Sequence, residues 1–404
     1  MNNPLWIDPD DFHYPELQGT VEADVAIVGG GLCGAGAAYA LRDADATVVL
    51  IEGRTLASGA SGRNAGFVLA GPAMPFGQAC ELVGFEEACA LWRLTVDNNR
   101  LMADLVDEYG IDCDYLRRGS MSLAVSDDEV QLLVATADRI AEAGFNACLV
   151  AAEDLPRPLD RMYAGGLYYP GNAEINPAAF VRGVARTAGG RVRIFERSPL
   201  LEIRSGTPHV LVTSTGEIRA HTVIMATNAY TSVLMPAMPI APTRGQVAAT
   251  RRVDRVIVPF PMYANYGYQY WRQTPEGRLV VGGWRDLDLA AEVGTDECLH
   301  DEIHASLDAF CASIVGADTP IEYRWAGIMG FTPDALPLVG VVPYEHDMYV
   351  AAGYSGHGVS MAFICGARVA LQAIGQSPHV PPSLSPGRFF DAAGQTSIRV
   401  RTSV

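Results

Sequence analysis

Two short apolar runs near the start of the chain lie on either side of a glycine-rich turn. Residues 24–28 form a continuous apolar run of the kind that becomes a strand buried in a parallel sheet. The turn Gly29-Gly30-Gly31-Leu32-Cys33-Gly34 follows, then an alanine-rich stretch, 35–43, that suits a helix. Residues 47–52 are a second apolar run that ends in a carboxylate. The pattern predicts a strand–turn–helix–strand unit.

The rest of the chain alternates between helical and extended patterns. The apolar spacing over 77–110 suits amphipathic helices, and 115–125 reads as a strand with a turn. A helix is predicted over 126–144, because Ser126 followed by three acidic residues is an N-cap signal. Three β-rich stretches lie within 190–227. The segment 348–374 repeats the strand, glycine turn and helix of the N-terminal unit.

Aromatic residues are concentrated between positions 259 and 284. Tyr266, Tyr268 and Tyr270 alternate along the chain, which predicts that the three rings share one face of a strand. Trp271 follows directly. The cluster fits either a wall of a binding site or the core of a packed sheet.

The glycine turn has the features of a dinucleotide-binding loop. Gly29 permits the sharp turn, Gly31 allows the backbone to approach a pyrophosphate, and Gly34 allows the helix to pack closely on the strand. Glu52 lies 18 residues after Gly34, at the end of the next strand, where a carboxylate binds ribose hydroxyls. An acidic residue there disfavours a 2′-phosphate and therefore NADP. NAD and FAD both remain compatible with this loop.

Composition excludes several other functions. A length of 404 residues indicates two or more domains, at about 150 residues for each. The net charge of −17 argues against a nucleic-acid partner, which requires clustered positive charge. All 29 basic residues are arginine, so no lysine can form a Schiff base. The cysteines and histidines show no metal-ligand spacing, and the first residues show no secretory signal, so we expect a cytoplasmic protein without metal.

Several further motifs, in this order, identify a family resemblance. They are Gly59-Ala60-Ser61-Gly62-Arg63-Asn64, Ile111-Asp112-Cys113-Asp114-Tyr115, Ala226-Thr227-Asn228-Ala229-Tyr230, Tyr323-Arg324-Trp325-Ala326-Gly327 and Gly353-Tyr354-Ser355-Gly356-His357-Gly358-Val359. With the glycine turn, they make the chain resemble the D-amino-acid-oxidase-like FAD-dependent amine oxidoreductases, which include glycine and sarcosine oxidases. Within that family it is most similar to the gamma-glutamylputrescine oxidase branch. The resemblance covers nearly the whole chain.

The resemblance implies an α/β fold (α+β overall) with a Rossmann-like FAD-binding domain and a second, sheet-based substrate domain. Residues 20–75, 150–232 and 320–385 would form the first, and 76–149 and 233–319 the second. The reaction implied is hydride transfer from a C–H next to nitrogen to flavin N5, followed by hydrolysis of the imine. The cofactor chemistry dominates, and the protein binds and orients it.

The family motifs also imply which residues hold the noncovalent FAD. Residues 60–66 would line the flavin and its ribityl chain, and the turn 353–359 would lie under the pyrimidine end of the ring. The expected cofactor residues are Gly29, Gly31, Leu32, Cys33, Gly34, Glu52, Gly53, Arg54, Ala60, Ser61, Arg63, Asn64, Ala65, Gly66, Leu200, Ala226, Thr227, Asn228, Gly327, Gly353, Tyr354, Ser355, Gly356, His357, Gly358 and Val359.

Three residues are expected to take part in catalysis. His357 serves either turn geometry and cofactor contact or proton transfer, for which its ordinary pKa is suitable. Tyr354 is expected beside the cofactor. Tyr270, with Tyr266, Tyr268 and Trp271, would surround a cationic amine through cation–π attraction, unless these rings form a sheet core.

Departures from the family pattern bear on the substrate. Met329 stands where an arginine binds the carboxylate of free amino acids, and Ser360 where a lysine does so in sarcosine-oxidase-like members. Arg285 is the nearest substitute for this clamp. The cysteine that attaches flavin covalently in some members would fall near Gly327, and the lysine that activates oxygen near Val280.

These observations favour FAD-dependent oxidation of a small-molecule amine, such as the polyamine derivative gamma-glutamylputrescine, with oxygen as acceptor. One alternative is an oxidase or dehydrogenase of glycine, D-amino acids or imino acids that uses oxygen, a quinone or a partner protein. Another is a flavin-binding protein without turnover. The oligomeric state and any proton-transfer residue stay open.

Overall fold

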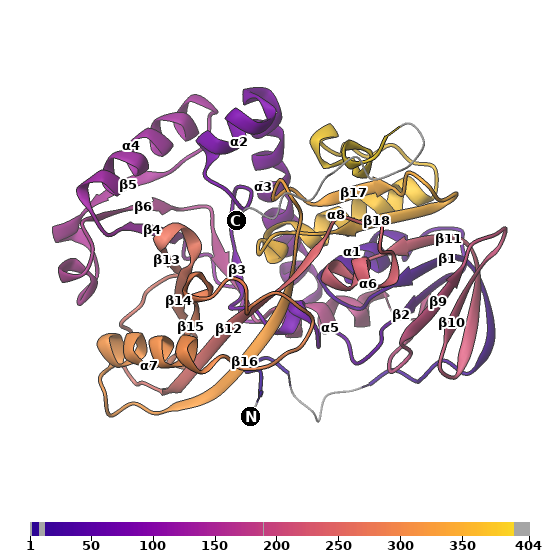
Figure 1. The fold of residues 1–404 in the computed structure, drawn as a ribbon, viewed down its shortest axis with the longest axis horizontal. Helices are drawn as coiled ribbons and strands as arrows, with labels where there is room; N and C mark the ends of the chain where they lie inside the picture. Colours follow the sequence, from indigo (N-terminus) through magenta and orange to yellow (C-terminus); the bar gives the residue numbers. More distant parts are fainter. Residues whose placement is uncertain (1, 8–12, 189, 392–404) are drawn as a thin grey trace.

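The computed structural model describes residues 2–7, 13–188 and 190–391, and it contains two large sheets side by side (Figure 1). Figure 1 shows the first sheet on the right and the second on the left. The α/β architecture predicted from the sequence is confirmed. No helix within the described ranges is both long enough and apolar enough to cross a bilayer.

The first sheet is mainly parallel, with the order β17-β18-β11-β1-β2-β8 and β9 and β10 attached to β11. Every residue of β2 is buried, as expected for a parallel strand covered on both faces. The strands are β1 (Gly19–Val28), β2 (Val48–Ile51), β8 (Val192–Phe195), β9 (Leu200–Arg204), β10 (His209–Thr213), β11 (Gly216–Met225), β17 (Leu338–Val341) and β18 (Met348–Ala352).

Four helices pack on one face of this sheet and form the largest hydrophobic core. They are α1 (Leu32–Leu41), α3 (Phe85–Tyr109), α5 (Pro177–Ala188) and α8 (Gly358–Ala373). A second core, which includes Met235, Met238 and Phe389, covers the opposite face. The sheet is therefore enclosed, and its glycine turn lies at the carboxyl end of β1.

Helices α1 and α8 meet backbone to backbone. A Cβ atom at Gly36 would collide with the carbonyl oxygen of Phe363, and one at Gly366 would collide with that of Cys33. Two glycines, one on each helix, thus permit an approach closer than any side chain would allow. Because α1 and α8 follow the parallel strands β1 and β18, the N-termini of both helices lie at the same end of the first sheet.

The second sheet is mostly antiparallel, with the order β16-β12-β15-β14-β13-β4-β6-β5. Helix α7 (Asp301–Val315) covers one face, where Ile303, Leu307 and Phe310 pack on Trp271 and Val281. The other face turns toward the first sheet. The strands are β4 (Ser120–Ala124), β5 (Cys148–Ala151), β6 (Gly165–Tyr169), β12 (Ala241–Arg252), β13 (Met262–Ala264), β14 (Gln269–Gln273), β15 (Arg278–Gly283) and β16 (Ile321–Phe331).

The remaining helices are α2 (Phe76–Val83), α4 (Asp127–Glu142) and the short α6 (Thr231–Leu234), and a two-residue pair joins β3 (Phe67–Val68) to β7 (Ala173–Glu174). The Ser126 cap of α4 is confirmed, since its hydroxyl accepts the backbone N–H of Glu129. The division into a discontinuous FAD domain and a substrate domain stays a prediction. In the strand order, β6 and β16 belong to the second sheet.

One predicted element is wrong. Tyr266, Tyr268 and Tyr270 do not share a strand, because β14 begins only at Gln269. Tyr266 lies in a 3₁₀ turn with φ of 53°, a left-handed conformation that interrupts an extended chain. Only Tyr270 therefore lies within the sheet.

The α1–α8 contact gives the first prediction. Replacing Gly366 with alanine forces the two backbones apart, so we expect the free energy of unfolding to fall by about 2–3 kcal/mol, as for an overpacked core. Chemical denaturation of the holoenzyme measures this. Gly77→Ala on α2 is the matched control, since its new Cβ meets open space and alanine favours a helix by about 1 kcal/mol. Equal effects of the two substitutions would show that the helices do not depend on the contact.

Candidate active site

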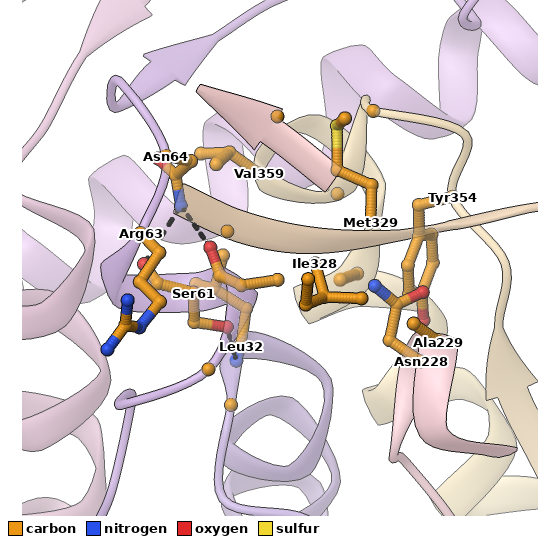
Figure 2. A pocket seen from close by; sticks show the side chains of 18 of the residues that line it. Leu32, Ser61, Arg63, Asn64, Asn228, Ala229, Ile328, Met329, Tyr354 and Val359 are labelled. Carbon is orange, nitrogen blue, oxygen red and sulfur yellow. Dashed lines mark hydrogen bonds between the residues drawn. The ribbon is translucent and has the colours of Figure 1, made fainter. Parts of the chain in front are cut away.

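A cavity of about 910 Å³ lies between the two sheets. The glycine turn, the loop 57–66 and the N-terminal end of α8 supply its wall on the side of the first sheet. Strands β13 to β16 and the segment 284–297 supply the opposite wall. Figure 2 shows part of the lining, with residues from β16 between the loop that carries Ser61 and the turn that carries Tyr354.

The glycine turn is fixed by two side chains that reach its backbone. The N–H of Leu32, the first residue of α1, donates to Ser61 Oγ at 2.8 Å (Figure 2). The Glu52 carboxylate accepts the N–H groups of Gly30, at 2.7 Å, and Arg54, at 2.9 Å. Burial raises the pKa of Glu52, and these two donors counteract the rise. A helix N-terminus and a nearby carboxylate match the needs of a pyrophosphate and a ribose.

The loop 60–66 is held rigid by its own asparagine. Asn64 Nδ2 donates to the carbonyl oxygens of Ala60 and Ser61, while its Oδ1 accepts the N–H of Gly66 at 2.7 Å (Figure 2). Trp6 Nε1 donates to the Asn64 carbonyl oxygen at 2.6 Å. The loop therefore has a fixed shape along the cavity.

Arg63 lines the cavity but directs its guanidinium into the protein. It donates to the carbonyl oxygens of Ser58 and Ala326, and Nη2 lies 3.0 Å from Glu297 Oε2. The same carboxylate pairs with Arg54 at 3.0 Å. Glu297 thus connects the segment 284–300 to both arginines of the cofactor loops.

At the other end of the cavity, the turn before α8 requires a glycine. Gly353 has φ of 79°, and its N–H donates to Asn228 Oδ1 at 3.0 Å. His357 occupies the N-cap position of α8, and burial lowers its pKa to about 4, so the ring is neutral at pH 7. Burial also raises the pKa of Tyr354, whose hydroxyl is enclosed beside Cys33. Both side chains are therefore neutral at pH 7.

Aromatic rings form the wall opposite the helix ends. Tyr263 and Tyr270 are paired across β13 and β14, and Phe67 meets them edge-on with centroid distances of 5.0 and 6.0 Å. Gly282, the partner of Tyr270 on β15, leaves room for the tyrosine ring. Burial raises the pKa of Tyr270 to about 12, so its hydroxyl stays protonated. Trp271 points to the other face and packs in the α7 core.

The cavity collects nearly all of the residues expected from the sequence. Every expected cofactor and catalytic position lines it except Gly34 and Gly353, which act through the backbone. Their roles toward FAD stay predictions. The sequence motifs did not indicate four residues of the site, Phe67, Tyr263, Arg272 and Glu297. A signal was available for Arg272, because alternation along β14 puts it on the same face as Tyr270.

Arg272 ties the aromatic wall to the cofactor loop. It is fully buried on β14, donates to the carbonyl oxygens of Ala65 and Ile175, and lies 3.3 Å from the buried Glu174 carboxylate. A buried pair of this kind holds its position only with such additional hydrogen bonds. The loop and the wall are therefore one rigid unit.

A Rossmann-type sheet with a glycine turn, facing a mostly antiparallel sheet across a long cavity, defines a dinucleotide-dependent oxidoreductase. The family model described as FAD dependent oxidoreductase (DAO) matches residues 24–372. The chain belongs to the DAO family and is an FAD-dependent amine or amino acid oxidoreductase.

Individual relatives agree with this assignment. Gamma-glutamylputrescine oxidoreductase of Escherichia coli is 28% identical over 398 residues, covering 91% of this chain and 89% of the relative. Glycine oxidase of Geobacillus kaustophilus is 28% identical over 368 residues, covering 86% and 92%. The crystal structure of that glycine oxidase has a TM-score of 0.78 at 23% identity, covering 92% of this chain and 100% of the other.

The Glu52 contacts give the second prediction. Glu52→Gln keeps the size of the side chain but removes the charged acceptor, so we expect FAD to bind about tenfold more weakly, the loss typical of a hydrogen bond to a charged group. Titration of apoprotein with FAD, followed by flavin fluorescence, measures the affinity. Glu81→Gln, exposed on α2, is the control and should leave the affinity unchanged. Unaltered FAD affinity in Glu52→Gln would contradict a role in ribose binding.

Proposed function

We propose that the enzyme oxidises a small amine at the carbon next to nitrogen, with an elongated polyamine derivative of the gamma-glutamylputrescine type as substrate and oxygen as acceptor. The aromatic wall of Phe67, Tyr263 and Tyr270 is the observation that carries this proposal. Its ring faces attract a cationic amine, and its apolar surface favours the neutral amine once water is excluded. The Escherichia coli relative bears the name gamma-glutamylputrescine oxidoreductase.

The positions of the family clamps support an amine over a free amino acid. Met329 lines the cavity with an apolar side chain. Ser360 is 1% exposed, and its hydroxyl accepts the backbone N–H of Leu69 at 2.9 Å, so it is committed to the protein. Neither residue offers a charge to a carboxylate beside the reacting carbon.

The chain's own groups divide the work of catalysis. The N-terminus of α1, Ser61 and Glu52 would hold the diphosphate and ribose of FAD, and the N-terminus of α8 would face the flavin. FAD, when bound, supplies the acceptor for the hydride. The α8 end stabilises negative charge that develops near it. His357 is neutral and Tyr270 is protonated, so neither residue is a strong base for the substrate. The amine must therefore bind in its neutral form, or lose its proton after binding, before the hydride leaves.

A covalent flavin link is not part of the proposal. Gly327 lies against Arg63, and a Cβ there would approach the Arg63 carbonyl oxygen to 2.8 Å, so a larger residue would displace the cofactor loop. Val280, at the place of the oxygen-activating lysine, is fully buried and apolar. Reaction of the reduced flavin with oxygen would therefore rely on groups other than a lysine at this position. The proposed location is the cytoplasm, where the eight free cysteines would stay reduced.

The third prediction tests the reaction itself. Anaerobic mixing of the holoenzyme with gamma-glutamylputrescine or putrescine should bleach the flavin absorbance, whereas glycine, sarcosine and D-alanine should not. Readmission of air should restore the colour and release peroxide. Bleaching by the small amino acids alone would overturn the amine assignment. Slow recolouring in air, together with rapid reoxidation by a quinone, would show that a quinone and not oxygen is the electron acceptor.

A further inference from the structure

Arg285 lines the cavity and holds its guanidinium over two aromatic rings. It lies two residues after the end of β15, and its Cζ lies 4.8 Å from the ring centroid of Tyr268 and 4.7 Å from that of Phe331. All three residues line the cavity. Stacking uses the faces of a guanidinium and leaves its in-plane N–H groups for a ligand.

No acid within the described part of the chain neutralises this cation. The other two arginines of the cavity, Arg54 and Arg63, both pair with Glu297. Among the acids next to Arg285, Asp286 accepts a hydrogen bond from Asn265 at 2.9 Å, and Asp288 lies 3.8 Å from His300. Arg285 is half-buried and has neither an ion pair nor a hydrogen bond from its guanidinium among the described residues. In a chain of net charge −17, such an arginine is a prepared anion site.

The position along β16 says which part of a substrate would reach Arg285. Gly327, Met329 and Phe331 alternate on this strand and all line the cavity. Gly327 contacts Arg63 of the cofactor loop, whereas Phe331 lies four residues farther along, about 13 Å away at the rise of a strand. Arg285 therefore lies beyond Met329 and away from Arg63, at a separation along β16 that an elongated substrate can span.

We propose that Arg285 binds a carboxylate of the substrate that is remote from the oxidised amine, which makes amines with a distal carboxylate the preferred substrate class. This rests on the proposed amine oxidation and adds the group that selects the substrate. The aromatic wall receives the amine, and the guanidinium holds the carboxylate by charge-assisted, bidentate hydrogen bonds. Length and charge together then favour carboxylated amines over free diamines and small amino acids.

The fourth prediction compares substrates that differ in the carboxylate. Gamma-glutamylputrescine and N-glutarylputrescine carry it, and N-acetylputrescine does not. In Arg285→Met, kcat/KM for the two carboxylated amines should fall about 10- to 100-fold, through KM, as expected for a lost charge-assisted hydrogen bond. The value for N-acetylputrescine should change little. Arg285→Lys should recover part of the preference, and Arg255→Met, at an exposed arginine outside the cavity, should match the wild type.

Glutarate provides a readout without turnover. Its binding to the wild-type holoenzyme should perturb the flavin spectrum, and Arg285→Met with full FAD content should bind it at least tenfold more weakly, again as expected for a hydrogen bond to a charged group. If no amine bleaches the wild type, the proposed amine oxidation is refuted. Loss of glutarate binding in Arg285→Met would still support the carboxylate site in that case. An equal loss of activity toward N-acetylputrescine, or unchanged glutarate binding, would overturn the inference. Oxidation of glycine or D-alanine by the wild type that is lost in Arg285→Met would place the bound carboxylate next to the reacting carbon. That result would overturn the inference as well.

Discussion

The site depends on one backbone contact, the crossing of α1 and α8 through Gly36 and Gly366. Both helices follow parallel strands, β1 and β18, so their N-termini open at the same end of the sheet, and the glycine contact lets the two helices pack closely there. Each N-terminus carries a partial positive charge of about half a unit, and Ser61 already accepts the first N–H of α1. In the proposed arrangement, one would face the diphosphate of FAD and the other its electron-accepting ring. In that arrangement, the parallel strands and the glycine contact would together align two electrostatic sites along one cofactor.

The second sheet contributes shape rather than charge. Tyr270 and Arg272 occupy the same face of β14, and the first borders the substrate space while the second holds the loop beside the cofactor. The buried Glu174 neutralises Arg272, so the link survives inside a low-dielectric core. A change on the substrate side of β14 is therefore transmitted to the position of the cofactor loop. Tyr270 and Arg272, two residues apart, would then serve the substrate and the cofactor respectively.

Local sequence signals predicted the parts of the fold that depend on neighbours in the chain. The β1–α1–β2 unit, the capped helix α4 and the β18–turn–α8 unit all follow from apolar period, glycine and cap residues. The signals failed at Tyr266, where a left-handed residue breaks a strand that the alternation predicts. Phe67 and Glu174 could not be found because their partners lie far away in sequence. Trp271 points toward the core under α7. The sequence of β14 alone does not reveal that this core lies on that side.

The segment 284–300 carries Arg285 at one end and Glu297 near the other, so a single stretch of chain contacts both the outer cavity and the two cofactor arginines. A ligand at Arg285 that orders this segment would therefore also affect the position of Glu297. By thermodynamic reciprocity, a ligand that orders the segment 284–300 would strengthen the binding of the cofactor, and the cofactor would strengthen the binding of that ligand to the same extent. Retention of the prosthetic group and recognition of the substrate would then be linked properties of this segment.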